Sequence, residues 1–294
     1  GANTGLPEQQ ASLMNWAAQE VSASSVQGLV FDGTYVWASD TTDNRLDRIR
    51  VSDGSDAGSF NDGTHDTPGA SVFDGTYIWT VYPNQQVVKK HDTSGSLLGS
   101  YSAGTQPWAL TFDGTYIWVL DNANNDVIKL LASTGATVGT YSSGSHPVAI
   151  TFDGSHIWIA NESSGNVTEL LASTGATVGT YPLGSSPTGI TFDGTYIWTS
   201  QWNSLHSIRA LIQILASTGA VVASYSTQYA PLNIAFDGTY LWVASGGGVV
   251  KVLPSTGGTV SNYATGSSTL FAMAFDGTTM WVGGTDNGVW RARQ

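Results

Sequence analysis

The chain has 294 residues, a formal net charge of −12 and no cysteine. The negative charge excludes nucleic acid and anionic membrane surfaces as expected partners, because phosphate groups repel an acidic protein. The lack of cysteine excludes disulfides and thiolate-bound metals. No apolar run approaches the roughly 20 residues needed to span a bilayer, so we predict no membrane insertion.

The N-terminal segment, residues 1–22, differs in pattern from the rest of the chain. Residues 7–18 are typical of a helix, with Pro7 in its first turn. We predict a short helix followed by a strand near residues 16–22. The alternative is that this segment packs only as a helix.

From Phe31 onward one seven-residue word recurs, and successive copies start 39 to 44 residues apart. This period is typical of the four-stranded blades of a β-propeller. No linker-like change of composition interrupts the repeats, so we predict an all-β, seven-bladed propeller with antiparallel blades as a single domain over residues 23–294. The copies are FDGTYVW at Phe31, FDGTYIW at Phe73, FDGTYIW at Phe112, FDGSHIW at Phe152, FDGTYIW at Phe192, FDGTYLW at Phe236 and FDGTTMW at Phe275.

The fourth repeat shows how one blade is built. Four short runs rich in β-branched and aromatic residues predict strands at about 148–152, 156–161, 166–171 and 176–181. Glycines in the intervening Asp-Gly and Ser-Thr-Gly sequences predict tight turns. Both faces of the second strand are apolar, so we expect the word tryptophans to lie between blades. We expect the word aspartates to accept hydrogen bonds from the turn backbone.

The last repeat ends at Gln294 after three predicted strands. A blade left in that state would expose the unpaired backbone groups of an edge strand. The residues before the first blade occupy the missing position in the topology. We therefore predict that the strand near residues 16–22 closes the ring as the outer strand of the last blade.

Comparison of the repeats with one another separates two sets of loops. The FDGT and STGA turns barely change, whereas the loop after each tryptophan strand and the crossover into the next blade differ in every copy. In a four-stranded meander these variable loops share one face, which we call the variable face. Individual loops on a rigid scaffold are where binding sites concentrate, and unconstrained drift is the alternative explanation.

Blades 3 to 5 carry the richest set of side chains on the variable face. Aromatic rings beside amides and carboxylates suit sugars, so we predict a glycan or a protein as the ligand. Two alternatives stay open: Trp108 fills the central channel, and the oxygen-rich loop from Asp121 to Asp126 holds Ca²⁺ although it lacks the features of an EF-hand. The predicted ligand-binding residues are Trp108, Asp121, His146, Asn161, Glu162, Gln201, Trp202 and His206.

The repeats also resemble a known group. Strings such as PVAITFDGSHIWIAN from Pro147 and LASTGATVGTY from Leu171 are similar to the repeats of secreted bacterial seven-bladed propellers of the YVTN and streptogramin-lyase-like group. The resemblance covers nearly the whole chain from about residue 22. It implies a propeller fold and a secreted or cell-surface location, but propellers host many unrelated activities.

The resemblance also implies what an enzyme of this group would need. Streptogramin lyases use histidine and glutamate with Mg²⁺ in the central funnel. The five histidines and four glutamates of this chain form no such motif, so we predict no catalytic residue, no cofactor and no metal. The predicted function is a non-catalytic binding or scaffold module. The alternatives are a lyase-type enzyme with a site in the funnel and a structural subunit of an extracellular assembly.

Overall fold

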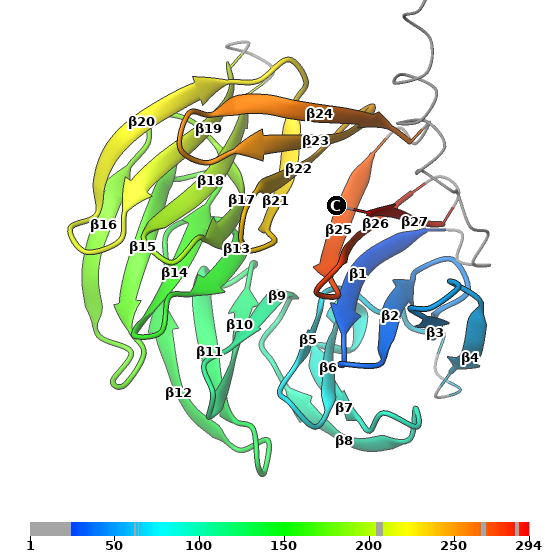
Figure 1. Cartoon of the computed structure of the whole chain (residues 1–294). Coiled ribbons are helices and arrows are strands. Elements are labelled where there is room, and N and C mark those ends of the chain that lie inside the picture. Colours follow the sequence, from blue (N-terminus) through cyan, green and yellow to red (C-terminus); the bar gives the residue numbers. More distant parts are fainter. Residues whose placement is uncertain are drawn as a thin grey trace, which may run out of the picture.

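A computed structural model describes residues 25–293, except residues 62, 64, 204–207, 266–268, 286 and 287. Seven small antiparallel sheets are arranged in a ring around a central axis, as Figure 1 shows. The predicted all-β, seven-bladed propeller is therefore confirmed. The predictions for residues 1–22 lie outside the described residues.

The first four blades are regular meanders. Blade 1 contains β1 (Val26–Phe31), β2 (Tyr35–Asp40), β3 (Arg45–Arg50) and β4 (Asp56–Phe60). Blade 2 contains β5 (Ser71–Phe73), β6 (Ile78–Tyr82), β7 (Val87–His91) and β8 (Leu97–Ser102), with a short 3₁₀ helix, η1 (Pro83–Gln85), after β6. Blade 3 contains β9 (Pro107–Phe112), β10 (Tyr116–Asp121), β11 (Asp126–Leu131) and β12 (Thr137–Ser142). Blade 4 contains β13 (Pro147–Phe152), β14 (His156–Asn161), β15 (Asn166–Leu171) and β16 (Thr177–Pro182), within one residue of the predicted bounds.

The last three blades complete the ring. Blade 5 contains β17 (Pro187–Phe192), β18 (Tyr196–Asn203), β19 (Ile208–Leu215) and β20 (Ala220–Ser226). Blade 6 contains β21 (Pro231–Phe236), β22 (Leu241–Ser245), β23 (Gly248–Leu253) and β24 (Gly258–Ala264). Blade 7 has three strands among the described residues, β25 (Leu270–Phe275), β26 (Thr279–Gly284) and β27 (Val289–Arg293). The first strands of neighbouring blades contact one another all the way round, including β1 with β25, so the inner wall is closed.

The repeated word is a turn held together by its own aspartate. In all seven copies one carboxylate oxygen accepts the two backbone N–H groups that follow the turn glycine, at 2.7–2.9 Å. The other oxygen accepts the indole N–H of the word tryptophan at 2.6–2.7 Å. The first contact confirms the prediction for the aspartates. The second explains why aspartate and tryptophan recur together five residues apart, since a buried indole N–H needs an acceptor.

The word tryptophans form the core between the blades, as predicted. All seven are at most 1% exposed. In blades 2 to 6 each packs on the tyrosine of its own outer strand, with ring centroids 5.4–5.8 Å apart. In blades 3 to 6 the glycine of the turn between the third and fourth strands lies against the tyrosine of the preceding blade; a Cβ on Gly175, for example, would overlap the ring of Tyr141. Neighbouring blades therefore interlock through one repeated contact.

Cations on the third strands bridge several of the blade interfaces. The Lys90 ammonium donates to the Ala132 carbonyl at 2.9 Å, and the Lys129 ammonium donates to the Ala172 carbonyl at 2.7 Å. Each ammonium also lies over the tyrosine and tryptophan rings of its own word. Burial lowers the pKa of both lysines. These cation–π contacts and hydrogen bonds compensate part of the cost of burying the charge.

Blade 4 departs from this arrangement at two positions at once. Glu169 replaces the lysine and His156 replaces the tyrosine of the word. His156 Nδ1 lies 3.4 Å from a carboxylate oxygen of Asp153 and 3.6 Å from one of Glu169. The Tyr181 hydroxyl donates to Glu169 at 2.6 Å, and burial together with Glu169 raises the pKa of Tyr181 to about 12. The two replacements are thus coupled through direct contacts.

Candidate functional site

The inner strands lie around the centre of the ring and begin on the variable face, and most of them share one irregularity at that end. In six blades the pairing of the first two strands shifts by one residue near the start of the inner strand. Such a β-bulge leaves one residue outside the ladder and re-aims its side chain. The residues at this position are Gln27, Trp108, Val148, Thr188, Leu232 and Phe271, and we call them the mouth ring.

The mouth ring is uncharged and is dominated by apolar groups. Trp108 is 44% exposed and Phe271 is 39% exposed, and they belong to blades 3 and 7, on opposite sides of the ring. Each follows a buried residue, Pro107 or Leu270, that holds the start of its strand. Blade 2 has Gly69 at the matching place in its sequence. Aromatic side chains are enriched at interfaces, so both residues are candidate ligand contacts.

Trp108 therefore retains a large accessible surface at the channel opening. Its alternative role, filling the channel, stays a prediction. The indole is available for stacking or apolar contact with a ligand. Its backbone is held on a bulged strand whose neighbours are buried, so the ring is presented from a rigid support.

Three of the predicted ligand-binding residues are buried at equivalent places. Asp121 and Asn161 end the second strand of their blades, Gln201 lies two residues before the end of β18, and all three are at most 2% exposed. Asp121 accepts the backbone N–H groups of Thr105 and Gln106 at 2.7 and 3.0 Å. These side chains hold the crossover loops that lead into the inner strands, so they position the mouth ring from behind.

Asn161 and Gln201 make similar contacts. Asn161 accepts the Gly144 N–H at 3.0 Å and donates to Asn166 and Thr168 at 2.8 and 2.9 Å. The Gln201 amide reaches the Ser185 carbonyl at 3.5 Å. The polar groups that would have paired with sugar hydroxyls are therefore largely occupied within the protein.

His146 and Glu162 form an exposed pair on blade 4. His146 Nδ1 lies 2.8 Å from a carboxylate oxygen of Glu162. The Glu162 N–H also donates to the His146 carbonyl at 2.9 Å, and the His146 N–H donates to Asn125 of blade 3 at 2.8 Å. The structure thus joins two predicted residues and ties them to the neighbouring blade, beside Val148 of the mouth ring.

Trp202 lies on the extended hairpin of blade 5, one strand away from the inner wall. It is 38% exposed and pairs with Arg209 across the hairpin. A cavity of about 60 Å³ lies between blades 5 and 6, with Leu211, Tyr229 and Val250 in its wall. His206 lies outside the described residues.

The proposed Ca²⁺ loop is held by protein contacts. The Asp121 carboxylate also accepts the Asn124 side-chain amide at 2.7 Å. One Asp126 oxygen is buried without a hydrogen-bond partner, and burial, together with the Asp121 charge, raises the pKa of Asp126. Over the described ranges, no three histidine, aspartate or glutamate side chains come together in a way that would hold a metal ion.

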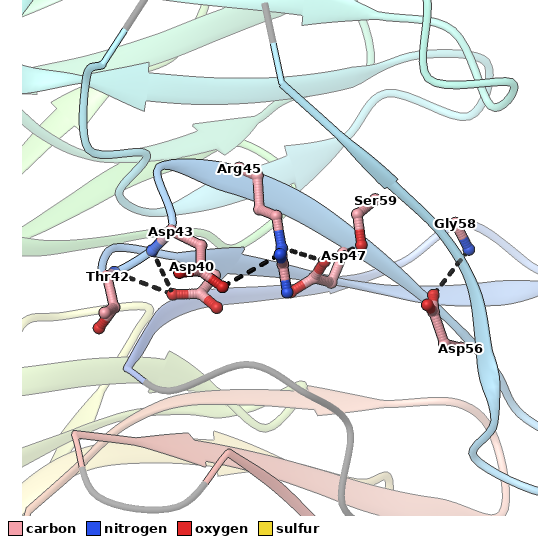
Figure 2. Close-up of polar contacts among 8 residues, drawn as sticks. All are labelled: Asp40, Thr42, Asp43, Arg45, Asp47, Asp56, Gly58 and Ser59. Carbon is pink, nitrogen blue, oxygen red and sulfur yellow. Dashed lines mark hydrogen bonds and ion pairs between the residues drawn. The ribbon is translucent and has the colours of Figure 1, made fainter.

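Blade 1 has the densest group of charges, drawn in Figure 2. The Arg45 guanidinium lies between Asp43 and Asp47, at 3.0 and 2.8 Å, and Ser59 donates to Asp47 at 2.5 Å. Asp40 accepts the N–H groups of the next loop. The second Asp47 oxygen is buried without a partner, and burial raises the pKa of this carboxyl.

Comparisons with known proteins identify the fold. Neither a protein-family model nor a curated protein matches the chain. Among solved structures, a streptogramin B lyase is similar over 95% of this chain and 98% of its own, with a TM-score of 0.80 and 18% identity. The chain has the fold of the streptogramin-lyase-like propellers. A hydrazine synthase of Kuenenia stuttgartiensis is similar over 100% of this chain and 99% of its own, with a TM-score of 0.80 and 14% identity.

Identities this low show only that these propellers share a fold. No helix in the described part of the chain is long and apolar enough to cross a membrane.

Sequence reasoning missed most of the mouth ring of this propeller. Only Trp108 was singled out, because it stands out as an aromatic residue at the start of a strand. Leu232 and Phe271 occupy the matching position in blades 6 and 7. The signal that locates them is the residue that follows the buried proline or aliphatic residue at each crossover, ten residues before the word tryptophan.

Proposed function

We propose that this propeller is a non-catalytic, secreted or cell-surface recognition module that binds a glycan or a protein at the mouth ring. The observation that carries the proposal is the bulge that six of the seven blades share at the start of the inner strand, with Trp108 and Phe271 left exposed at that position. A few such anchors commonly supply most of the affinity of a recognition site.

The arrangement of supporting residues favours recognition. Asp121, Asn161 and Gln201 form hydrogen bonds with the backbone of the crossover loops. These three side chains therefore fix the backbone behind the mouth ring before any ligand binds. Preorganisation of this kind reduces the entropy lost on binding. The secreted or surface location rests on the resemblance of the repeats and forms part of the proposal.

The test is a direct search for ligands that depend on the mouth ring. Purified protein is screened on a glycan array and against a random peptide library, and the hits are measured by isothermal titration. Truncation of Trp108 to alanine should weaken binding by about 30-fold, which corresponds to about 2 kcal/mol for an aromatic anchor. Trp202→Ala tests whether the blade 5 hairpin belongs to the same site.

Control substitutions lie on the opposite face. Asp53 and Ser96 sit in turns between third and fourth strands, so Asp53→Asn and Ser96→Ala should leave the affinity unchanged. Equal affinity of the wild type, Trp108→Ala and Phe271→Ala would remove the mouth ring as the site.

A further inference from the structure

We propose that the ligand is an extended protein segment that presents an aromatic or aliphatic side chain to the mouth ring beside lysine or arginine residues. This inference rests on the proposed function and decides between its two ligand classes. It is carried by where the structure places positive charge, negative charge and free hydrogen-bonding groups.

The first observation is that little positive charge is exposed: among the described arginines, Arg50 and Arg209 are the exposed ones, and Arg209 lies on the blade 5 hairpin. All four lysines, Lys89, Lys90, Lys129 and Lys251, are only 2–6% exposed. They lie on third strands, each over at least one aromatic ring. Arg48 and Arg291 are likewise stacked on word tryptophans.

The second observation is that acidic groups gather on the variable face of blades 1 to 4. Carboxylates stand at the ends of second strands, in the loops that follow them and in the crossovers. Among the described residues of these blades, Arg45 is the one arginine on this face, and it is already paired with Asp43 and Asp47. The carboxylates are Asp40, Asp43, Asp66, Asp121, Asp126 and Glu162, of which Asp40 and Asp121 are buried and the other four are at least partly exposed.

This distribution of charge favours a partner that carries positive charge. Carboxylates around an uncharged opening attract cations and repel anions, and complementary charge mainly raises the association rate and the specificity. A phosphorylated or acidic ligand would meet no exposed lysine on this face. A ligand with ammonium or guanidinium groups can pair with the exposed Glu162 and Asp43.

The third observation concerns the chemistry of the opening. Trp108, Val148, Leu232 and Phe271 offer apolar surface, and among the mouth-ring residues only Gln27 and Thr188 are polar. The Thr188 hydroxyl already donates to the Pro231 carbonyl at 2.9 Å. A sugar needs several free donors and acceptors around its ring, and Asp121, Asn161 and Gln201 are occupied. An apolar side chain needs none, so a protein segment fits this opening better than a glycan.

The experiment uses the full chain and short synthetic peptides. Each peptide carries one central tryptophan, phenylalanine or leucine, flanked by lysine and arginine, by glycine and serine, or by aspartate and glutamate. Binding is measured by fluorescence anisotropy at ionic strengths of about 50 and about 500 mM, because screening weakens contacts between exposed charges. A glycan array is run in parallel on the same preparation.

We expect the basic peptides to bind at least about 10-fold more tightly than the neutral ones and the acidic ones not to bind. High salt should reduce that difference. Trp108→Ala should weaken the basic peptides by about 30-fold, and Glu162→Gln should reduce their salt dependence. Val178→Ala is the matched control, because Val178 is an equally exposed apolar residue on an outer strand of blade 4.

The outcomes separate this inference from the function it rests on. Peptides that bind through Trp108 regardless of their charge would overturn the basic ligand and leave the mouth ring as the site. Glycans that bind through Trp108 while the peptides fail would overturn the protein ligand. If Trp108→Ala leaves the affinity for every peptide and glycan that binds unchanged, both proposals are overturned.

Discussion

Replacing Trp158 by alanine tests the central claim about stability, that the repeated word holds the blades together. Trp158 is fully buried and packs in a cluster with Ile197 and Ile214 of blade 5. Its ring stacks on Tyr181 with centroids 5.7 Å apart, and its indole N–H donates to Asp153 at 2.7 Å. The substitution therefore removes apolar contacts, an aromatic pair and a hydrogen bond to a carboxylate.

The expected loss is about 5 kcal/mol of the free energy of unfolding. Truncation of a buried tryptophan costs about 3–5 kcal/mol. A hydrogen bond to a charged group contributes about 1.5–3 kcal/mol, and because that cost is contained in the truncation value, it moves the estimate to the upper end. Trp158→Phe keeps part of the ring and removes the N–H, so it should lose about 2–3 kcal/mol.

Urea unfolding followed by circular dichroism measures both variants, with stability taken from the midpoint and the slope. Trp202→Ala is the matched control, since this tryptophan is 38% exposed on the blade 5 hairpin and should cost about 1 kcal/mol or less. A loss below about 2 kcal/mol for Trp158→Ala, or equal losses for Trp158→Ala and Trp202→Ala, would refute the assignment of the word tryptophan to the core.

Four further predictions address the charged groups and the edge of the ring. Burial raises the pKa of Asp47 above its ordinary 3.8, so between the two pKa values the folded chain keeps a proton that the unfolded chain has lost. The stability contributed by this group therefore falls as pH rises through that window. The urea midpoint of Asp47→Asn should fall less over this pH range than the midpoint of the wild type. In blade 4, His156→Tyr and Glu169→Lys together should recreate the arrangement that surrounds Lys129 in blade 3. A double-mutant cycle should therefore show a favourable coupling of at least about 1 kcal/mol, whereas additive effects would contradict the direct contacts. Because the four lysines are at most 6% exposed, an amine-reactive reagent followed by mass spectrometry should leave them unmodified in the folded protein and modify them in urea; rapid labelling of Lys129 in the folded state would show that its interface opens. Deletion of residues 1–22 should lower the melting temperature or cause aggregation if this segment closes the last blade; unchanged melting would count against that closure.

Much of the fold was readable from the repeats, because a blade is built from local contacts. Asp153 and Gly154 lie within a few residues of the backbone groups and the indole that they organise, so the word carries its own turn and its own hydrogen bonds. The apolar residues on both faces of the strand from His156 to Asn161 indicated burial on both sides. The number of blades and the bounds of the blade 4 strands therefore followed from the repeat, as did the burial of the seven tryptophans.

The candidate site was only partly readable. Asp121, Asn161 and Gln201 look like ligand contacts in a variable loop, yet each is buried and holds a crossover segment about 16 residues away. Trp108 was found because its residue type is conspicuous. Phe271 was missed because its position acquires meaning only when the inner strands are aligned around one axis.

The sequence by itself determined the propeller, because turn chemistry and strand periodicity act over a few residues and were repeated seven times. Only the tertiary structure decided where charge and apolar surface are exposed. Lys129 is buried because blade 4 supplies the Ala172 carbonyl and blade 3 supplies the rings that receive its ammonium. Phe271 stays exposed because a bulge in β25 leaves it outside the sheet. Both results depend on which residues of other strands and blades come together, and that is settled when the ring closes.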